Sequence, residues 1–226
     1  MKLIKSFFLC TLTVLAAVSC NKEQEVPEGS PVDLVYKASY ALDGFSWEKG
    51  DMFSLLDGNN NFGFRTSGSG ARAEFSGTAV KYPEGTSLIA VTPYSEDYVL
   101  DGRNFQAVVP TSVTAYPGVK EGGIAVGIPD GDEIVFKHVN AFLEVELTRG
   151  DVRGLVLRGG NDENLAGTYR VNVASSGAAT MTLTGEGSSS LAVVGELTPG
   201  KYYIPVPPQG YNGFRFSVKP KIPCQT

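Results

Sequence analysis

The stretch Phe142-Leu143-Glu144-Val145-Glu146-Leu147 alternates apolar and acidic residues with a period of two. Side chains of a β-strand point alternately to opposite faces, so this pattern predicts a strand with one buried face and with Glu144 and Glu146 in solvent. Similar alternation recurs along most of the chain, and helical periodicity is hard to find. We therefore predict an all-β protein.

Turn-forming pairs such as Asp57-Gly58, Asp101-Gly102 and Asp130-Gly131 separate the alternating segments. Roughly a dozen short strands with turns every 8–12 residues indicate antiparallel sandwiches. The predicted strands cover residues 33–40, 52–56, 73–77, 87–91, 103–108, 134–138, 142–147, 154–157, 167–173, 179–183, 201–206 and 214–218.

The chain has 226 residues, a hydrophobic share of 42% and a net charge of −5. This length suits one large or two small domains, and the negative charge disfavours nucleic-acid binding. The only histidine, His138, leaves no basis for a His-rich metal site or for most Ser-His and Cys-His catalysis. We assign no catalytic residue, no metal site and no cofactor, and we expect a protein that is not an enzyme.

The first residues form a basic head, an apolar run over 7–15 and small residues that end before Cys20. This layout predicts a signal peptide over residues 1–19. The small residues before Cys20 resemble a bacterial lipoprotein signal, and the resemblance implies that Cys20 is lipidated and anchors the protein in a membrane. An ordinary secretory leader is the alternative.

Residues 20–31 are polar, acidic and proline-containing, which predicts a flexible tether. The acidic residues that follow Cys20 resemble the surface-export signal of Bacteroidetes lipoproteins, so we expect an outer-membrane protein exposed on the cell surface. A second break in the pattern lies near residues 127–132. We place a domain boundary there, which gives an N-terminal domain over 32–130 and a C-terminal domain over 131–226.

An ordered set of short motifs resembles the fimbrillin-like surface lipoproteins of Bacteroidetes, of the major and minor fimbrillin type. The set consists of Trp47-Glu48-Lys49-Gly50-Asp51, residues 73–77, residues 88–94, Gln106, residues 135–143, residues 165–167 and residues 202–208. The resemblance implies two tandem transthyretin-like β-sandwich domains. It also implies a structural or adhesive component of fimbriae, as subunit, anchor or tip. Relatives of this kind assemble with other fimbrial subunits by strand complementation.

Strand complementation points to two segments of this chain. The candidates for strand exchange are Val32, Leu34 and Tyr36 near the N-terminus, and Phe214, Phe216 and Val218 near the C-terminus. Polymerising relatives lose an N-terminal strand to an Arg-specific protease. No arginine lies between Cys20 and Trp47, so either another protease acts or the strand is retained. Because the chain stops soon after 214–218, the second sandwich is expected to lack its closing strand and to expose an edge.

Two other readings stay open. The first is a surface glycan-binding lipoprotein of a polysaccharide-uptake system, in which Tyr94, Tyr98, Tyr211 and Phe214 form a sugar-stacking platform; packing in the sandwich core would also explain these residues. The second concerns Arg149-Gly150-Asp151, which matches an integrin-recognition tripeptide and is equally typical of a β-turn. Receptors or glycans on host or bacterial surfaces are therefore further candidate partners.

Overall fold

The computed structural model describes residues 27–120 and 122–220, and all regular elements in this part of the chain are β-strands. The all-β class is therefore confirmed. No helix of these residues is long and apolar enough to cross a membrane. The strands are β1 (Pro31–Tyr40), β2 (Met52–Leu56), β3 (Asn61–Thr66), β4 (Arg72–Val80), β5 (Ile89–Thr92), β6 (Asn104–Val109), β7 (Ser112–Thr114), β8 (Ala125–Gly127), β9 (Glu133–His138), β10 (Ala141–Leu147), β11 (Val152–Gly159), β12 (Ala166–Val173), β13 (Ala179–Ser188), β14 (Ser190–Leu197), β15 (Gly200–Val206) and β16 (Phe214–Pro220).

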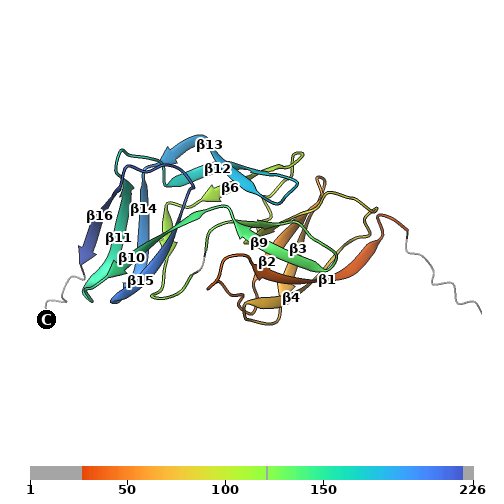
Figure 1. The fold of residues 1–226 in the computed structure, drawn as a ribbon, viewed down its shortest axis with the longest axis horizontal. Coiled ribbons are helices and arrows are strands. Elements are labelled where there is room, and N and C mark those ends of the chain that lie inside the picture. Colours follow the sequence, from red (N-terminus) through yellow and green to blue (C-terminus); the bar gives the residue numbers. More distant parts are fainter. Residues whose placement is uncertain (1–26, 121, 221–226) are drawn as a thin grey trace, which may run out of the picture.

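Seven strands form a closed sheet in the order β1-β4-β3-β2-β5-β8-β9, on the right of Figure 1. The ring closes where β1 and β9 pair in parallel, from Lys37 opposite Glu133 to Tyr40 opposite Phe136. Lys37 Nζ lies 2.7 Å from the Asp132 carboxylate beside this seam, and Arg72 pairs with Glu133. The interior is filled by large aromatic side chains, and those fully buried there are Trp47, Phe53, Phe64, Phe75 and Phe136.

The three-stranded sheet β13-β12-β6 packs against the outside of the closed sheet. Residues from β6 and β12 share a buried cluster with Ile89 and Val91 of β5 and with Val126 of β8. Ala90 of β5 faces the other way, into the closed sheet. Strand β5 is therefore buried on both faces, which explains why its sequence is a continuous apolar run rather than an alternation.

At the far end of the molecule, the sheet β16-β11-β14-β7 packs against the pair β10-β15 (Figure 1). Strands β11 and β15 of the two layers contribute to a third core, in which Leu155, Leu157, Tyr202 and Ile204 are buried. The backbone beyond β7 lies beside β15, because Gly118 N donates to Lys201 O at 2.7 Å. Strands β7 and β16 are the two opposite edges of the four-stranded sheet. Because the β7 side of β15 is taken by this backbone segment, β10 lies on the side of β15 that is nearer to β16.

Strand pairing crosses residue 130 in both directions. Strands β6 and β7 precede this residue, yet they pair with β12 and β14. Strand β9 follows it, yet it pairs with β1 and β8. Strand pairing therefore connects residues on both sides of the boundary between 32–130 and 131–226 that the sequence suggests, because turn and linker composition marks where a strand ends but not which strand it joins.

The turn Trp47-Glu48-Lys49-Gly50-Asp51 lies between β1 and β2 and leads the chain into β2. Asp51 Oδ2 accepts a hydrogen bond from Glu48 N at 2.8 Å, and Gly50 adopts a φ of 99°, which favours glycine. Trp47 is 1% exposed and its Nε1 donates to Ala38 O at 3.0 Å. Its ring stacks on Tyr40 at 4.2 Å and meets Phe75 and Phe136 edge-on.

Replacing Trp47 with alanine is expected to lower the free energy of unfolding by about 3–5 kcal/mol, because it leaves a large cavity in the aromatic interior of the closed sheet. Val99→Ala is the control, since Val99 is 71% exposed and surface truncations change stability by about 0.5 kcal/mol or less. Chemical denaturation of both variants measures the difference. Equal effects would show that Trp47 does not anchor the fold.

Candidate functional site

An apolar row on β16 extends beyond the layer that covers it. Val218 lies opposite Leu155, and Phe216 lies opposite Leu157, in the antiparallel pair β11-β16. Directly opposite residues point to the same face of a sheet, so all four belong to the face that forms the third core. Leu155 is 3% exposed and Leu157 is fully buried, whereas Phe216 is 44% exposed and Val218 is 40% exposed.

The covering layer is too narrow to reach this row. It consists of β10 and β15 alone, above a sheet of four strands. Tyr202 and Ile204 of β15 are fully buried, but Leu143 and Val145 of β10 are only half-buried. Within the described residues, the second edge of β10 pairs with no strand. The position beside β10, above Phe216 and Val218, can therefore accept a further strand, and we call it the open position.

The N-terminal exchange candidates lie at the opposite end of the molecule (Figure 1). Val32, Leu34 and Tyr36 belong to β1, which pairs with β4 from Pro31 to Ser39. Tyr36 is 6% exposed, and its ring packs edge-on against Phe53 and Phe64 at centroid distances of 6.2 and 5.2 Å. The structure thus builds β1 into the closed sheet, whereas Phe216 and Val218 at the C-terminal end remain accessible.

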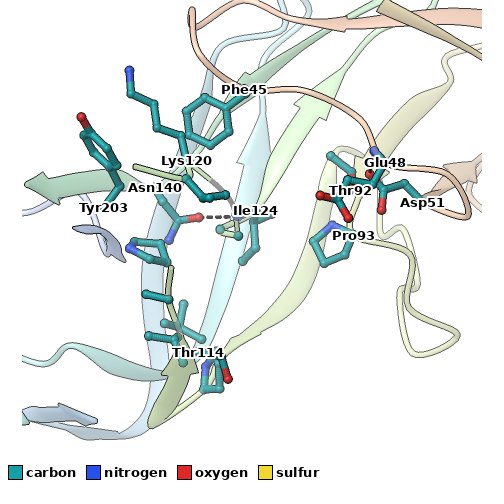
Figure 2. A pocket seen from close by; sticks show the side chains of 18 of the residues that line it. Phe45, Glu48, Asp51, Thr92, Pro93, Thr114, Lys120, Ile124, Asn140 and Tyr203 are labelled. Carbon is teal, nitrogen blue, oxygen red and sulfur yellow. Dashed lines mark hydrogen bonds between the residues drawn. The ribbon is translucent and has the colours of Figure 1, made fainter. Parts of the chain in front are cut away.

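A second feature is a cleft of about 790 Å³ at the junction between the closed sheet and the β10-β15 pair (Figure 2). One wall carries Glu48, Asp51 and Thr92, which come from the closed sheet and its first turn. The other wall carries Lys120 and Tyr203. The Lys120 ammonium lies 5.2 Å from the centre of the Tyr203 ring and donates to Asp43 O at 3.1 Å.

The floor of the cleft is held by Asn140. Its Oδ1 accepts a hydrogen bond from Ile124 N at 2.5 Å, the dashed line in Figure 2. This bond joins the turn between β9 and β10 to the segment that enters β8. Both segments line the cleft. The arrangement offers acids on one wall and a cation beside an aromatic ring on the other, which is suited to a polar ligand with apolar faces.

The four aromatic residues considered for a sugar platform separate into two pairs. Tyr94 and Tyr98 line the cleft, but Tyr98 is 8% exposed and packs in the core against Phe105. Tyr211 and Phe214 contact each other at the edge of the third core, with ring centroids 4.7 Å apart. Tyr94 is half-buried, and its ring packs over Gly63. Of the four predicted tyrosine and phenylalanine residues, only Tyr94 is an accessible residue of the cleft. Tyr203 also lines the cleft, but the sequence did not single it out, because its place in a strand pattern already explained it.

The tripeptide Arg149-Gly150-Asp151 connects β10 and β11, and its two charged side chains bind each other. Arg149 Nε lies 2.6 Å from Asp151 Oδ1, and a second guanidinium nitrogen lies 2.5 Å from Oδ2. This hydrogen-bonded pairing lowers the pKa of Asp151. A receptor would have to break the pair to bind both groups separately, so the conformation favours a turn over a displayed ligand.

His138 closes one side of the aromatic cluster at the junction. Its ring stacks on Tyr40 at 5.1 Å and contacts Phe45 and Phe142 at 4.1 and 5.0 Å. Nδ1 is buried and has no hydrogen-bond partner. Burial lowers the pKa of His138 to about 4. No cluster of three or more metal-binding side chains occurs among the residues described.

Acid is expected to destabilise the protein through His138. The unfolded chain binds a proton near pH 6.5, whereas the folded chain resists it until about pH 4. The free energy of unfolding therefore falls as pH drops from about 6.5 to 4, by about 1–2 kcal/mol once partial exposure is taken into account. His138→Phe should remove this component, so that the difference in stability between the two proteins changes with pH. A difference that is constant between pH 7 and pH 4 would contradict the effect.

Comparisons with known proteins give one structural likeness. No family model and no curated protein sequence match the chain. The fold is similar to the crystal structure of a candidate cell adhesion protein from Bacteroides ovatus, with 12% sequence identity and a TM-score of 0.41. The match covers 85% of this chain and 78% of that chain.

Proposed function

We propose that this protein is a fimbrillin-like lipoprotein of the cell surface that assembles with other subunits by strand complementation. The observation that carries the proposal is the open position, where an unpaired edge of β10 lies beside the uncovered side chains of Phe216 and Val218. An added strand would satisfy the free backbone groups of β10 and bury the apolar row at the same time.

The sequence features fit the same role. The resemblance to fimbrillin-like proteins and the lipoprotein pattern before Cys20 support a location at the outer membrane, with Cys20 as the proposed anchor. Residues 1–26 and 221–226 lie outside the described residues, so this part of the proposal stands on the sequence alone. The role needs no catalytic residue and no cofactor, because backbone pairing and apolar burial supply the interaction energy.

Assembly is tested with the full chain on the surface of producing cells. Phe216→Lys places a charge beneath the incoming strand and is expected to remove high-mass cross-linked species, since burial of a phenylalanine contributes about 1.5–3 kcal/mol. The matched control is Val194→Lys: Val194 is 42% exposed, close to the 44% of Phe216, but it lies in β14, next to the buried Val193. Loss of cross-linking in both variants, or in neither, would count against the open position.

A second candidate function is glycan binding in the cleft, which Tyr94, Tyr203 and the polar walls favour. Carbohydrates are bound by aromatic faces together with hydrogen-bonding side chains, and the cleft presents both.

Glycan binding is tested by affinity electrophoresis in gels that contain surface polysaccharides. Tyr94→Ala is expected to weaken retention roughly 3- to 10-fold, since an aromatic contact contributes about 0.5–1.5 kcal/mol. Tyr116→Ala is the control, because Tyr116 is 55% exposed and does not line the cleft. Retention that is absent in the unaltered protein, or equal in all three proteins, would exclude this function for the cleft.

A further inference from the structure

The open position selects its partner by two separate rows of side chains. On the inner face, Leu143 and Val145 of β10 continue the apolar surface of Phe216 and Val218. On the outer face, β10 presents Glu144 and Glu146, both exposed. A strand added here must therefore be apolar on one face, and its other face must tolerate two carboxylates as neighbours.

Both charged residues in the outer row of β10 are acidic. Lys201 of β15 lies opposite Glu146 and binds Glu144 at 2.7 Å, and Lys120 also interacts electrostatically with Glu144. Cross-strand neighbours lie about 4.5–5.5 Å apart, at which opposite charges stabilise and like charges destabilise a pair. The outer face of the incoming strand should consequently carry lysine or arginine.

Strand β16 has this pattern itself. Phe214, Phe216 and Val218 form its inner face, and Arg215, Ser217 and Lys219 form its outer face. It has seven residues, as does β10, and it is an edge strand whose second side pairs with nothing in the described residues. Strand β1 fits less well, because Asp33 alternates with Val32 and Leu34 and would lie near the carboxylates.

We infer that the partner at the open position is β16 of a second copy of this chain, and that the contact is reciprocal across a two-fold axis. The inference rests on the strand complementation proposed above. The far end of each molecule has four strands in one layer and two in the other. When β16 of each molecule pairs with β10 of the other, the four-stranded layer of one molecule continues the two-stranded layer of the other.

This dimer would pair the free edge of β10, cover the exposed apolar row and bring basic side chains to the acidic outer row. It extends both layers to six strands, places the two copies of the Phe216 and Val218 row face to face, and sets the basic row of β16 beside the acidic row of β10. Neither strand leaves its own sheet, so no core is opened. A two-fold contact of this kind is closed, and it gives a dimer rather than a filament.

The test is a charge exchange between two variants of the full chain, purified in mild detergent. The first carries Glu144→Lys and Glu146→Lys. The second carries Ser217→Glu and Lys219→Glu, which leave the ion pair between Arg215 and Asp162 in place. Each variant alone brings like charges together in both contacts of its dimer, whereas a mixed dimer has opposite charges in both.

Sedimentation velocity is expected to show a dimer for the unaltered chain, a dissociation constant raised roughly tenfold or more for each variant alone, and a restored dimer for the mixture. The control variant carries Glu84→Lys and Glu96→Lys, which change the net charge by as much as the first variant does but at exposed positions elsewhere, and it should dimerise normally. Circular dichroism checks that all chains fold.

Three results would overturn the inference. One is a dimer that neither charge variant weakens, which would place the contact elsewhere. Another is a mixture that stays monomeric. The third is an unaltered chain that is monomeric. If Phe216→Lys still abolished cross-linking on cells, strand complementation would stand, but with a different partner. If Phe216→Lys left cross-linking unchanged, both strand complementation and the two-fold dimer would be ruled out.

Discussion

The apolar face of a β-sheet has to be covered, and the two ends of this molecule solve that requirement differently. The closed sheet covers its inner face by curving round on itself, and the part of its outer face formed by β2, β5 and β8 is covered by β13-β12-β6. At the other end, a sheet of four strands meets a layer of two. The exposed row of Phe216 and Val218 follows directly from this mismatch, and so does every functional interpretation that depends on an added strand.

Alternation predicted most strands because it records which side chains are buried. The segment predicted over 52–56 coincides with β2, and the segment over 214–218 lies within β16. Four strands were missed: β3, β7, β8 and β14. Strand β8 is three residues long and buried on both faces, so its sequence cannot alternate. Strand β14 has Val193 and Val194 side by side, followed by Gly195, which breaks the expected period.

The site was only partly predictable. Period-two patterning assigned Phe214, Phe216 and Val218 to one face and sent Glu144 and Glu146 to solvent, and the structure confirms both assignments. Which strand neighbours which is set by long-range pairing, on which local patterns carry no information. The parallel seam between β1 and β9 and the return of β6 to β12 therefore had no signal in the sequence. The cleft was unpredictable for the same reason, since its walls come from distant segments.

The crossing of residue 130 has a mechanical consequence. The chain passes between the closed sheet and the other sheets three times, from β5 to β6, from β7 to β8 and from β9 to β10. Tension applied along the long axis is therefore shared by three covalent connections, where a tandem pair of modules would have a single hinge. We therefore expect the molecule to transmit tension as one rigid unit, and not as two domains joined by a flexible linker.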